Sequence, residues 1–267
     1  MRIALPPTID PAALSGHDSA VELITLDGET MGTTWRVMFA APRDSDADAV
    51  RHAIVRRLAG LVAEMSHWVP DSLLSRFNRS PTGTWTTLPP DFGQVMHHGL
   101  AIASTTRGAF DPAIGRLVDC WGFGPVAVAG PPDAAMIEAE RALSGWQRLT
   151  YAPVSRHLHQ PGGVSLDLSG IAKGHAVDAV ADLLRTFGIM HTLVEIGGEL
   201  VGRGIRPDGE PWWVDLEAPP GILLKPLRIA LHGMAVATSG DYRRGAHTID
   251  PHTGRPINSG VVSASVI

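Results

Sequence analysis

Short apolar segments separated by Gly, Pro and Asp fill the C-terminal half of the chain, and they limit its fold more than any other feature. Each segment is too short for an ordinary helix, and β-branched residues and alternation are frequent in them. The pattern predicts that this half forms mainly β-sheet. The segments are Thr192–Ile196, Glu199–Val201, Trp212–Glu217, Leu227–Leu231, Met234–Thr238, His247–Asp250 and Val261–Val266.

The first two thirds of the chain carry most of the helix signals. Apolar residues recur at steps of three and four, with capping residues before them and glycines after them. They predict four helices: one from a cap at Asp44 or Ser45 to Met65, one from a cap at Asp91 to Arg107 and closed by Gly108, one over Asp133–Leu143, and one over Ala172–Phe187 that stops at Gly188. Ahead of them, Val21–Ala40 reads as a β-hairpin around the turn signal Asp27-Gly28.

Helices and strands in this arrangement predict an α+β (mixed α/β) fold, with helices packed on largely antiparallel sheets. The chain has 267 residues, a length that leaves one or two domains open. We expect residues 1–20 to be a loose N-terminal lead-in and residues 21–267 to form a single domain.

Composition excludes several classes of protein. The net charge of −5 provides no general positive field for nucleic acid, and 44% hydrophobic against 18% charged residues is atypical of a disordered chain. The single Cys120 allows no intrachain disulfide and no CxxC zinc site. No apolar run approaches the roughly 18 residues of a membrane span. Prolines 6, 7 and 11 stand where a signal peptide has its apolar core, so we expect a cytoplasmic protein, or a periplasmic one if a leader has been removed.

One segment is suited to an anion. Residues 166–176 run from a short apolar strand through the turn at Gly170 into the best-defined helix, whose start offers unpaired N–H groups. Lys173, one of only two lysines, adds an ammonium that can reach phosphate oxygens, and Asp167 can orient a polar ligand group. The alternative is a tight strand-to-helix connection with a solvated Lys173. The segment is neither a Walker loop nor GxGxxG.

Three further segments can contact a ligand, and each can also be read as purely structural. Residues 108–115 and 121–124 combine glycines with aromatic rings that can stack on a planar ligand or form a core corner. Gly197-Gly198 permits a close backbone approach or a simple hairpin turn. Within residues 237–254, His247 can carry a proton, while Asp241 and Asp250 can bind a metal or merely form turns. The absence of GxSxG and the apolar surroundings of Cys120 argue against a Ser or Cys hydrolase.

Together these segments resemble the ApbE family of FAD:protein FMN transferases over roughly residues 30–267. The resemblance rests on seven motifs that follow the family's order. They are Met31–Trp35, Pro70–Asn78, Phe110–Pro112 with Trp121–Gly124, Asp167–Gly174, Gly197-Gly198, Thr238–Tyr242 and His247–Gly254.

The resemblance implies a T-fold-related architecture that binds FAD and, with Mg²⁺, splits its diphosphate, transfers FMN to a Thr or Ser hydroxyl of an acceptor flavoprotein, and releases AMP. It implies that Gly170 offers its carbonyl to the metal and that His247 and Lys173 are catalytic. By position, the implied FAD contacts are Met31, Ala109, Phe110, Asp111, Asp167, Lys173 and Ile249.

The pattern departs from the family at the end of the chain. In the family, the strand similar to Val261–Val266 leads into an Ala-Asp-Ala-x-x-Thr segment whose Asp and Thr complete the metal site, whereas this sequence stops at Ile267. We therefore expect the domain to lack its C-terminal metal-ligand segment. Two functions besides transfer stay open: an FAD-binding protein with little or no catalysis, or a hydrolase that converts FAD to FMN and AMP.

Overall fold

The computed structural model describes residues 1–42, 45–242 and 245–267. The chain divides into two compact units that are each discontinuous in sequence. The first unit comprises residues 1–59, 173–243 and 261–267, and the second comprises residues 60–172 and 244–260. Helix α1 (Ala47–Met65) begins in the first unit and ends in the second. The sequence-based expectation of one domain over residues 21–267 stays a prediction.

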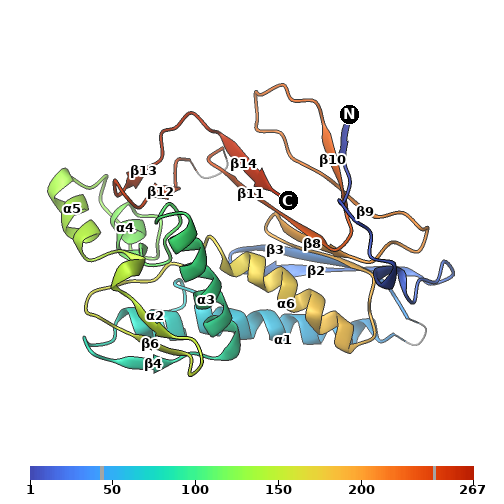
Figure 1. Cartoon of the computed structure of the whole chain (residues 1–267), viewed down its shortest axis with the longest axis horizontal. Helices are drawn as coiled ribbons and strands as arrows, with labels where there is room; N and C mark the ends of the chain where they lie inside the picture. Colours follow the sequence, from blue (N-terminus) through green and yellow to red (C-terminus); the bar gives the residue numbers. More distant parts are fainter. Residues whose placement is uncertain (43–44, 243–244) are drawn as a thin grey trace. The chain divides into compact units, whose positions relative to one another are not determined.

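A six-stranded antiparallel sheet is the centre of the first unit (Figure 1). The strand order is β14-β11-β8-β7-β3-β2. A second sheet, in the order β1-β10-β9, is mixed because β1 and β10 run parallel. The strands are β1 (Arg2–Ala4), β2 (Leu23–Thr30), β3 (Thr33–Ala40), β7 (Thr192–Ile196), β8 (Glu199–Arg203), β9 (Trp212–Asp215), β10 (Leu227–Leu231), β11 (Met234–Gly240) and β14 (Ser263–Val266).

Both faces of the six-stranded sheet are covered. On β3, Trp35, Val37 and Phe39 alternate along one face and are buried. Met38 points to the opposite face, where it packs against a core that includes Trp212 of β9. Helix α1 lies along β2 and β3. Its Arg51 donates a hydrogen bond to the Asp27 carbonyl of β2, and the Arg51 guanidinium lies 5.9 Å from the centre of the Trp35 ring of β3. Ion pairs of Lys173 and Arg203 connect helix α6 (Ala172–Thr186) with β8.

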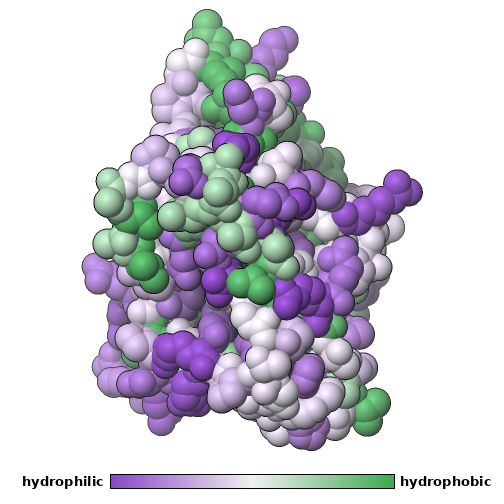
Figure 2. All heavy atoms as spheres, turned by 90° about the vertical axis from the view of Figure 1, so that its left-hand side faces the viewer, coloured by the Kyte–Doolittle hydropathy of each residue, from purple (hydrophilic) through white to green (hydrophobic). Residues whose placement is uncertain are grey.

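The second unit is mainly helical. Its helices are α2 (Leu73–Asn78), α3 (Pro90–Thr105), α4 (Gly115–Cys120), α5 (Ala134–Ala142) and the short 3-10 helix η2 (Trp146–Arg148). They accompany a three-stranded antiparallel sheet in the order β4-β6-β5, formed by Trp85–Thr87, His157–His159 and Thr150–Ala152. A two-stranded ribbon pairs β12 (Ile249–Asp250) with β13 (Arg255–Pro256). Figure 2 shows hydrophilic residues and small groups of hydrophobic residues interspersed over the face that it presents.

The α+β prediction with largely antiparallel sheets is confirmed, and most predicted elements lie within a few residues of their expected bounds. The hairpin turn is an exception: Asp27 pairs with Arg36 inside the strands, and the chain reverses at Met31-Gly32, where φ is 51° and 69°. Gly28 is required for another reason, because a Cβ there would lie 2.7 Å from the Trp35 indole nitrogen.

Two helices begin at other caps than predicted. Helix α1 is capped by Asp46, whose Oδ1 accepts the Ala49 N–H at 2.9 Å. The predicted cap Ser45 was therefore wrong. The other predicted cap, Asp44, lies outside the described residues. Asp91 lies in the first turn of α3, with Pro89 at the cap position. Gly108 does close α3, since its N–H donates to the Ala103 carbonyl at 2.7 Å.

The N-terminal lead-in contains some regular structure, namely β1 and the short 3-10 helix η1 (Pro11–Leu14). Strand β1 exists because its residues pair with Leu227–Ile229 of β10, a partner far away in the sequence. Among the described residues, no helix is long and apolar enough to cross a membrane.

Candidate functional site

The turn before α6 is built by Asp167 and Leu168. Oδ1 of Asp167 accepts the Ser169 N–H at 2.7 Å and the Ser169 hydroxyl at 2.5 Å, which closes an Asx turn. The Leu168 carbonyl accepts the N–H groups of Ile171 and Ala172 at 3.0 and 2.8 Å. Gly170 lies exposed within this turn, where a Cβ would lie 3.2 Å from the Phe110 ring. The chain therefore enters α6 with a fixed geometry.

Lys173, in the first turn of α6, is neither free nor simply solvated. Its Nζ donates to both carboxylate oxygens of Glu199, at 2.8 and 2.7 Å, and lies 3.5 Å from the Gly197 carbonyl oxygen. The Lys173 side chain is 31% exposed. An ammonium that is held but still accessible is available to an anion at the start of the helix.

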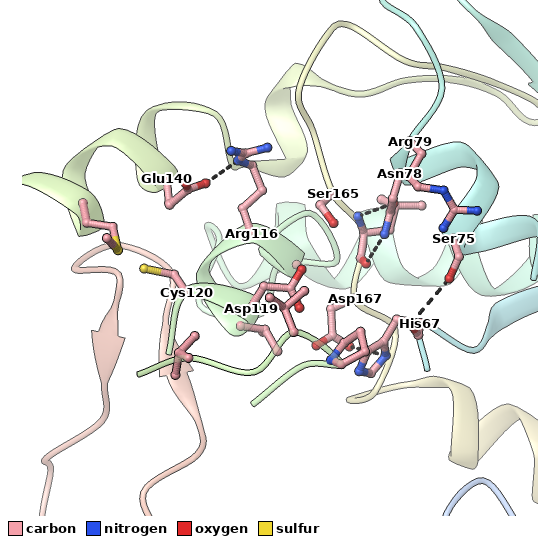
Figure 3. A pocket seen from close by; sticks show the side chains of 17 residues that line it. His67, Ser75, Asn78, Arg79, Arg116, Asp119, Cys120, Glu140, Ser165 and Asp167 are labelled. Atoms are coloured by element: carbon pink, nitrogen blue, oxygen red, sulfur yellow. Dashed lines mark hydrogen bonds and ion pairs between the residues drawn. The ribbon is translucent and has the colours of Figure 1, made fainter. Parts of the chain in front are cut away.

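A cavity of about 480 Å³ lies within the second unit, next to Asp167 (Figure 3). Its volume is in the range of small-molecule sites. His67, Asp119 and Asp167 converge on one part of it, and Arg116 paired with Glu140 lies on another. The remaining lining residues are Ser75, Asn78, Arg79, Gly115, Val118, Cys120, Pro125, Val126, Val128, Met136, Ser165 and Leu166.

Charge in this cavity is concentrated around His67. Its Nδ1 lies 3.9 Å from Oδ1 of Asp167, and its Nε2 is buried with no hydrogen-bond partner among the described residues. Burial raises the pKa of Asp119, an effect opposed by the nearby His67 and reinforced by Asp167. A ligand with hydrogen-bond donors would complement the two carboxylates.

The predicted contacts Ala109, Phe110 and Asp111 lie beside this turn, because the Asp167 N–H donates to the Pro112 carbonyl at 2.9 Å. The Asp111 carboxylate already has two partners: Oδ1 accepts the Ala113 N–H at 2.8 Å and Oδ2 accepts the Trp146 N–H at 3.0 Å. Burial raises the pKa of Asp111, while these amides lower it. Its carboxylate thus connects two loops.

The segment around His247 combines a half-buried imidazole with turn-forming residues. Nδ1 of His247 lies 2.9 Å from the Gly245 carbonyl oxygen, and its ring meets the Phe123 ring edge-on at 6.4 Å between centroids. Ile249 is buried in β12. Asp250 accepts the His252 N–H at 3.0 Å and the Thr253 hydroxyl at 3.0 Å, so it forms a turn as the plainer interpretation required.

Backbone contacts explain three more of the predicted motifs. Trp121 donates its indole N–H to the Gly254 carbonyl at 2.8 Å, which makes the Trp121 motif a corner between loops. Gly197-Gly198, at φ of 59° and 97°, is the two-residue turn between β7 and β8. Met31 is the first residue of the β2–β3 turn. Met31 and Lys173 belong to the first unit, and the other predicted site residues belong to the second.

Four residues of the site escaped the sequence analysis as individual candidates: His67, Asp119, Glu199 and Asn78. Asn78 stood only inside a motif, yet its side-chain amide donates to the Leu166 carbonyl at 3.0 Å and accepts the Leu166 N–H at 2.8 Å. It thereby fixes the segment that leads to Asp167; this segment is not a β-strand, so the short strand predicted ahead of the helix was wrong. The partner of Asn78 is 88 positions away, so no local pattern marks this role.

The described residues do not contain a ready-made metal centre. No group of three or more His, Cys, Asp and Glu side chains among them is arranged to hold a metal ion. Gly170 remains the one predicted ligand, through its carbonyl. Since Mg²⁺ needs a near-octahedral set of oxygens, the described side chains alone do not fit this ion, and we derive no catalytic step through it.

An antiparallel α+β fold with an accessible lysine at a helix start and, in the second unit, a cavity of small-molecule size is typical of the class of small-molecule-binding proteins. Comparison with known proteins specifies the class further: the ApbE family model matches residues 31–267, and the chain belongs to this family. The FAD:protein FMN transferase of Vibrio cholerae is 37% identical, over 95% of this chain and 79% of its own length. That of Klebsiella pneumoniae is 35% identical, over 95% and 78%.

Solved structures agree with this assignment. The flavin transferase ApbE from Vibrio cholerae matches with a TM-score of 0.86 at 37% identity, covering 92% of this chain and 81% of that one. The apo form of the Pseudomonas stutzeri flavinyl transferase ApbE matches with a TM-score of 0.84 at 34% identity, covering 92% and 79%. The recognition of the family from sequence motifs is confirmed.

Proposed function

We propose that this protein transfers FMN from FAD to a Thr or Ser hydroxyl of an acceptor flavoprotein and releases AMP. The observation that carries the proposal is Lys173, held by Glu199 in the first turn of α6, in a chain 37% identical to an FAD:protein FMN transferase. An ammonium at the start of a helix, where the helix dipole favours negative charge, is suited to binding a diphosphate.

The proposed reaction is a displacement at phosphorus. The acceptor hydroxyl oxygen forms a bond to the FMN phosphorus, the bond from that phosphorus to the bridging diphosphate oxygen breaks, and AMP leaves with that oxygen. The hydroxyl proton passes to His247, the residue that the family resemblance implies as catalytic. Lys173 stabilises the negative charge that accumulates on the diphosphate.

Dependence on Mg²⁺ is part of the proposal because the family resemblance implies it. When bound, the ion would neutralise negative charge on the diphosphate, and Gly170 is the residue that the resemblance implies as one of its ligands.

Purified protein, FAD and a flavoprotein subunit with a Thr or Ser flavinylation site test the proposal. The reaction is run with and without Mg²⁺, AMP is quantified by chromatography, and bound flavin is detected by fluorescence after denaturing electrophoresis. Lys173→Ala is compared with Lys225→Ala, which removes the only other lysine. We expect both products to depend on Mg²⁺ and to fall in Lys173→Ala alone.

Three results would contradict parts of the proposal. AMP and free FMN without a protein adduct would replace transfer by hydrolysis of FAD. Retained FAD binding without AMP at any Mg²⁺ concentration would replace catalysis by flavin binding alone. Equal losses in Lys173→Ala and Lys225→Ala would contradict the role of the helix start.

A further inference from the structure

Ion pairs connect α6 with β8 at two places, Lys173 and Arg203, and they differ in kind; Arg203 also lies 3.8 Å from Asp178. Near the end of β8, Arg203 pairs with Asp182 at 2.6 Å, and the aspartate side chain is 66% exposed. At the beginning of β8, Glu199 holds Lys173 through both oxygens, and the Glu199 side chain is only 17% exposed. Exposed pairs contribute little, whereas a bidentate, largely buried partner fixes a lysine in one place.

The position of Glu199 is fixed by the turn before it. Ile196 and Glu199 are directly paired across β7 and β8, so only Gly197-Gly198 separates them. The Gly198 N–H donates to Oε1 of Glu195 at 2.8 Å, which secures the turn. At Gly197, a Cβ would lie 2.7 Å from Cγ2 of Thr33, so glycine is required there. Glu199 therefore starts from a rigid backbone.

Holding the Lys173 ammonium in place reduces the conformational entropy that is lost when an anion binds to it. A lysine side chain loses much conformational freedom when it is ordered. If Glu199 has already ordered Lys173, a diphosphate binding at the start of α6 does not meet that cost. The glutamate has the same sign of charge as the diphosphate, so it also weakens binding of the ground state.

We infer that Glu199 is a positioning residue, which holds the Lys173 ammonium at the start of α6 in the orientation that the transferred phosphoryl group needs. This inference rests on the proposed function, because Lys173 must face the diphosphate of FAD. In this role Glu199 acts through Lys173, the residue whose ammonium it holds. Glu199 orders Lys173 and at the same time lowers the affinity for FAD. A merely structural role would not produce these two effects together.

Kinetics of AMP release from FAD give the first test, with Glu199→Gln as the variant. The amide keeps one acceptor for Lys173 and removes the negative charge. We expect kcat to fall roughly tenfold, as for the loss of a hydrogen bond to a charged group, while KM for FAD stays equal or decreases. Glu199→Asp retains the charge on a shorter side chain, so its kcat should lie between those of the wild-type protein and Glu199→Gln.

Asp182→Asn is the matched control, because it removes the 2.6 Å ion pair that Arg203 forms between the same helix and the same strand. It should leave both kcat and KM unchanged. Equal losses of kcat in Asp182→Asn and Glu199→Gln would indicate general loosening of α6 and would overturn the inference. So would an increase of KM in Glu199→Gln at unchanged kcat.

A second measurement does not need turnover. The chain has only two lysines, so protein labelled with ¹³C-lysine gives two sets of side-chain signals, assigned with Lys225→Arg. A held Lys173 should show two distinct Hε signals, which merge in Glu199→Gln and persist in Asp182→Asn. Merged Hε signals in the wild-type protein would overturn the inference.

Addition of FAD distinguishes a failure of the proposed function from a failure of the positioning role of Glu199. Failure of the Lys173 signals to shift with FAD would count against the proposed function. A wild-type shift together with unchanged kinetics in Glu199→Gln would leave the proposed function intact and refute the positioning role.

Discussion

Asp111→Asn separates a structural role of this residue from a role in ligand binding. The resemblance implies that Asp111 contacts FAD, but both of its oxygens accept backbone N–H groups, from Ala113 at 2.8 Å and from Trp146 at 3.0 Å. The side chain is 7% exposed. Asparagine keeps one oxygen acceptor and turns an NH₂ group toward the second N–H. One hydrogen bond to a charged group is lost and one backbone donor is left unpaired.

The magnitude follows from these contacts. A hydrogen bond to a charged group contributes about 1.5–3 kcal/mol, and an unpaired buried donor costs about 1–3 kcal/mol. The neutral amide avoids the desolvation that raises the pKa of Asp111, which offsets part of the loss. We expect the free energy of unfolding to decrease by about 2 kcal/mol, equivalent to a Tm lower by about 4–8 °C for a chain of this size.

Urea titration followed by tryptophan fluorescence measures the change, and FAD affinity is measured on the same samples at a temperature where both proteins are folded. Asp119→Asn is the control: burial raises the pKa of Asp119 too, but the other groups acting on it are charged side chains, with no backbone amide within the described part of the chain. It should be neutral or stabilising. Unchanged stability in Asp111→Asn, together with weaker FAD binding, would refute the structural argument.

Three further substitutions and conditions probe the scaffold. Asn78→Leu removes both hydrogen bonds to Leu166 and should lower the free energy of unfolding by about 2–4 kcal/mol, measured by urea titration; an unchanged value would mean that water satisfies the Leu166 backbone. Gly204→Ala places a Cβ 2.0 Å from Nδ1 of His191 at φ +61° and should lower the free energy of unfolding by more than about 2 kcal/mol. Gly209→Ala, at φ +84° with no atom within 4 Å, should lower it less. Similar thermal denaturation of the two variants would contradict the packing argument. Burial, assisted by His17, lowers the pKa of His191, so the folded state favours the neutral imidazole. The stability that this provides is fully present above the unfolded pKa of about 6.5. It is lost as the pH falls below that value, because the unfolded chain then binds the proton more readily than the folded one. The free energy of unfolding should therefore decrease between pH 7.5 and 5.5, and His191→Asn should flatten this dependence.

Local signals were sufficient where an element depends on its own residues. Helix α6 lies where its apolar spacing and Gly188 placed it, and β7 and β10 have the predicted bounds. Only the last predicted residue of α6 differs, because the helix ends at Thr186 and Phe187 is 40% exposed. Periodicity and glycine stops act over one or two turns, a range that a sequence pattern covers.

Local signals failed where a residue's role comes from another strand. Asp27-Gly28 has the composition of a turn, yet Trp35 of β3 lies over Gly28, and the chain continues as β2 to Thr30. Strand β1 is formed by pairing with β10, more than two hundred positions away. Cross-strand packing overrides the preference of a dipeptide, because it involves more contacts than a turn does.

The sequence alone determined the type and order of most elements, the helix start with its lysine, and membership of a family, because all of these are encoded in short, ordered runs of residues. Tertiary structure decided which groups these residues meet: Glu199 for Lys173, His67 for Asp167, and two backbone amides for Asp111. The reason is physical. Charge, burial and hydrogen bonding in a site are properties of pairs of groups, and the members of these pairs lie on different elements of the chain.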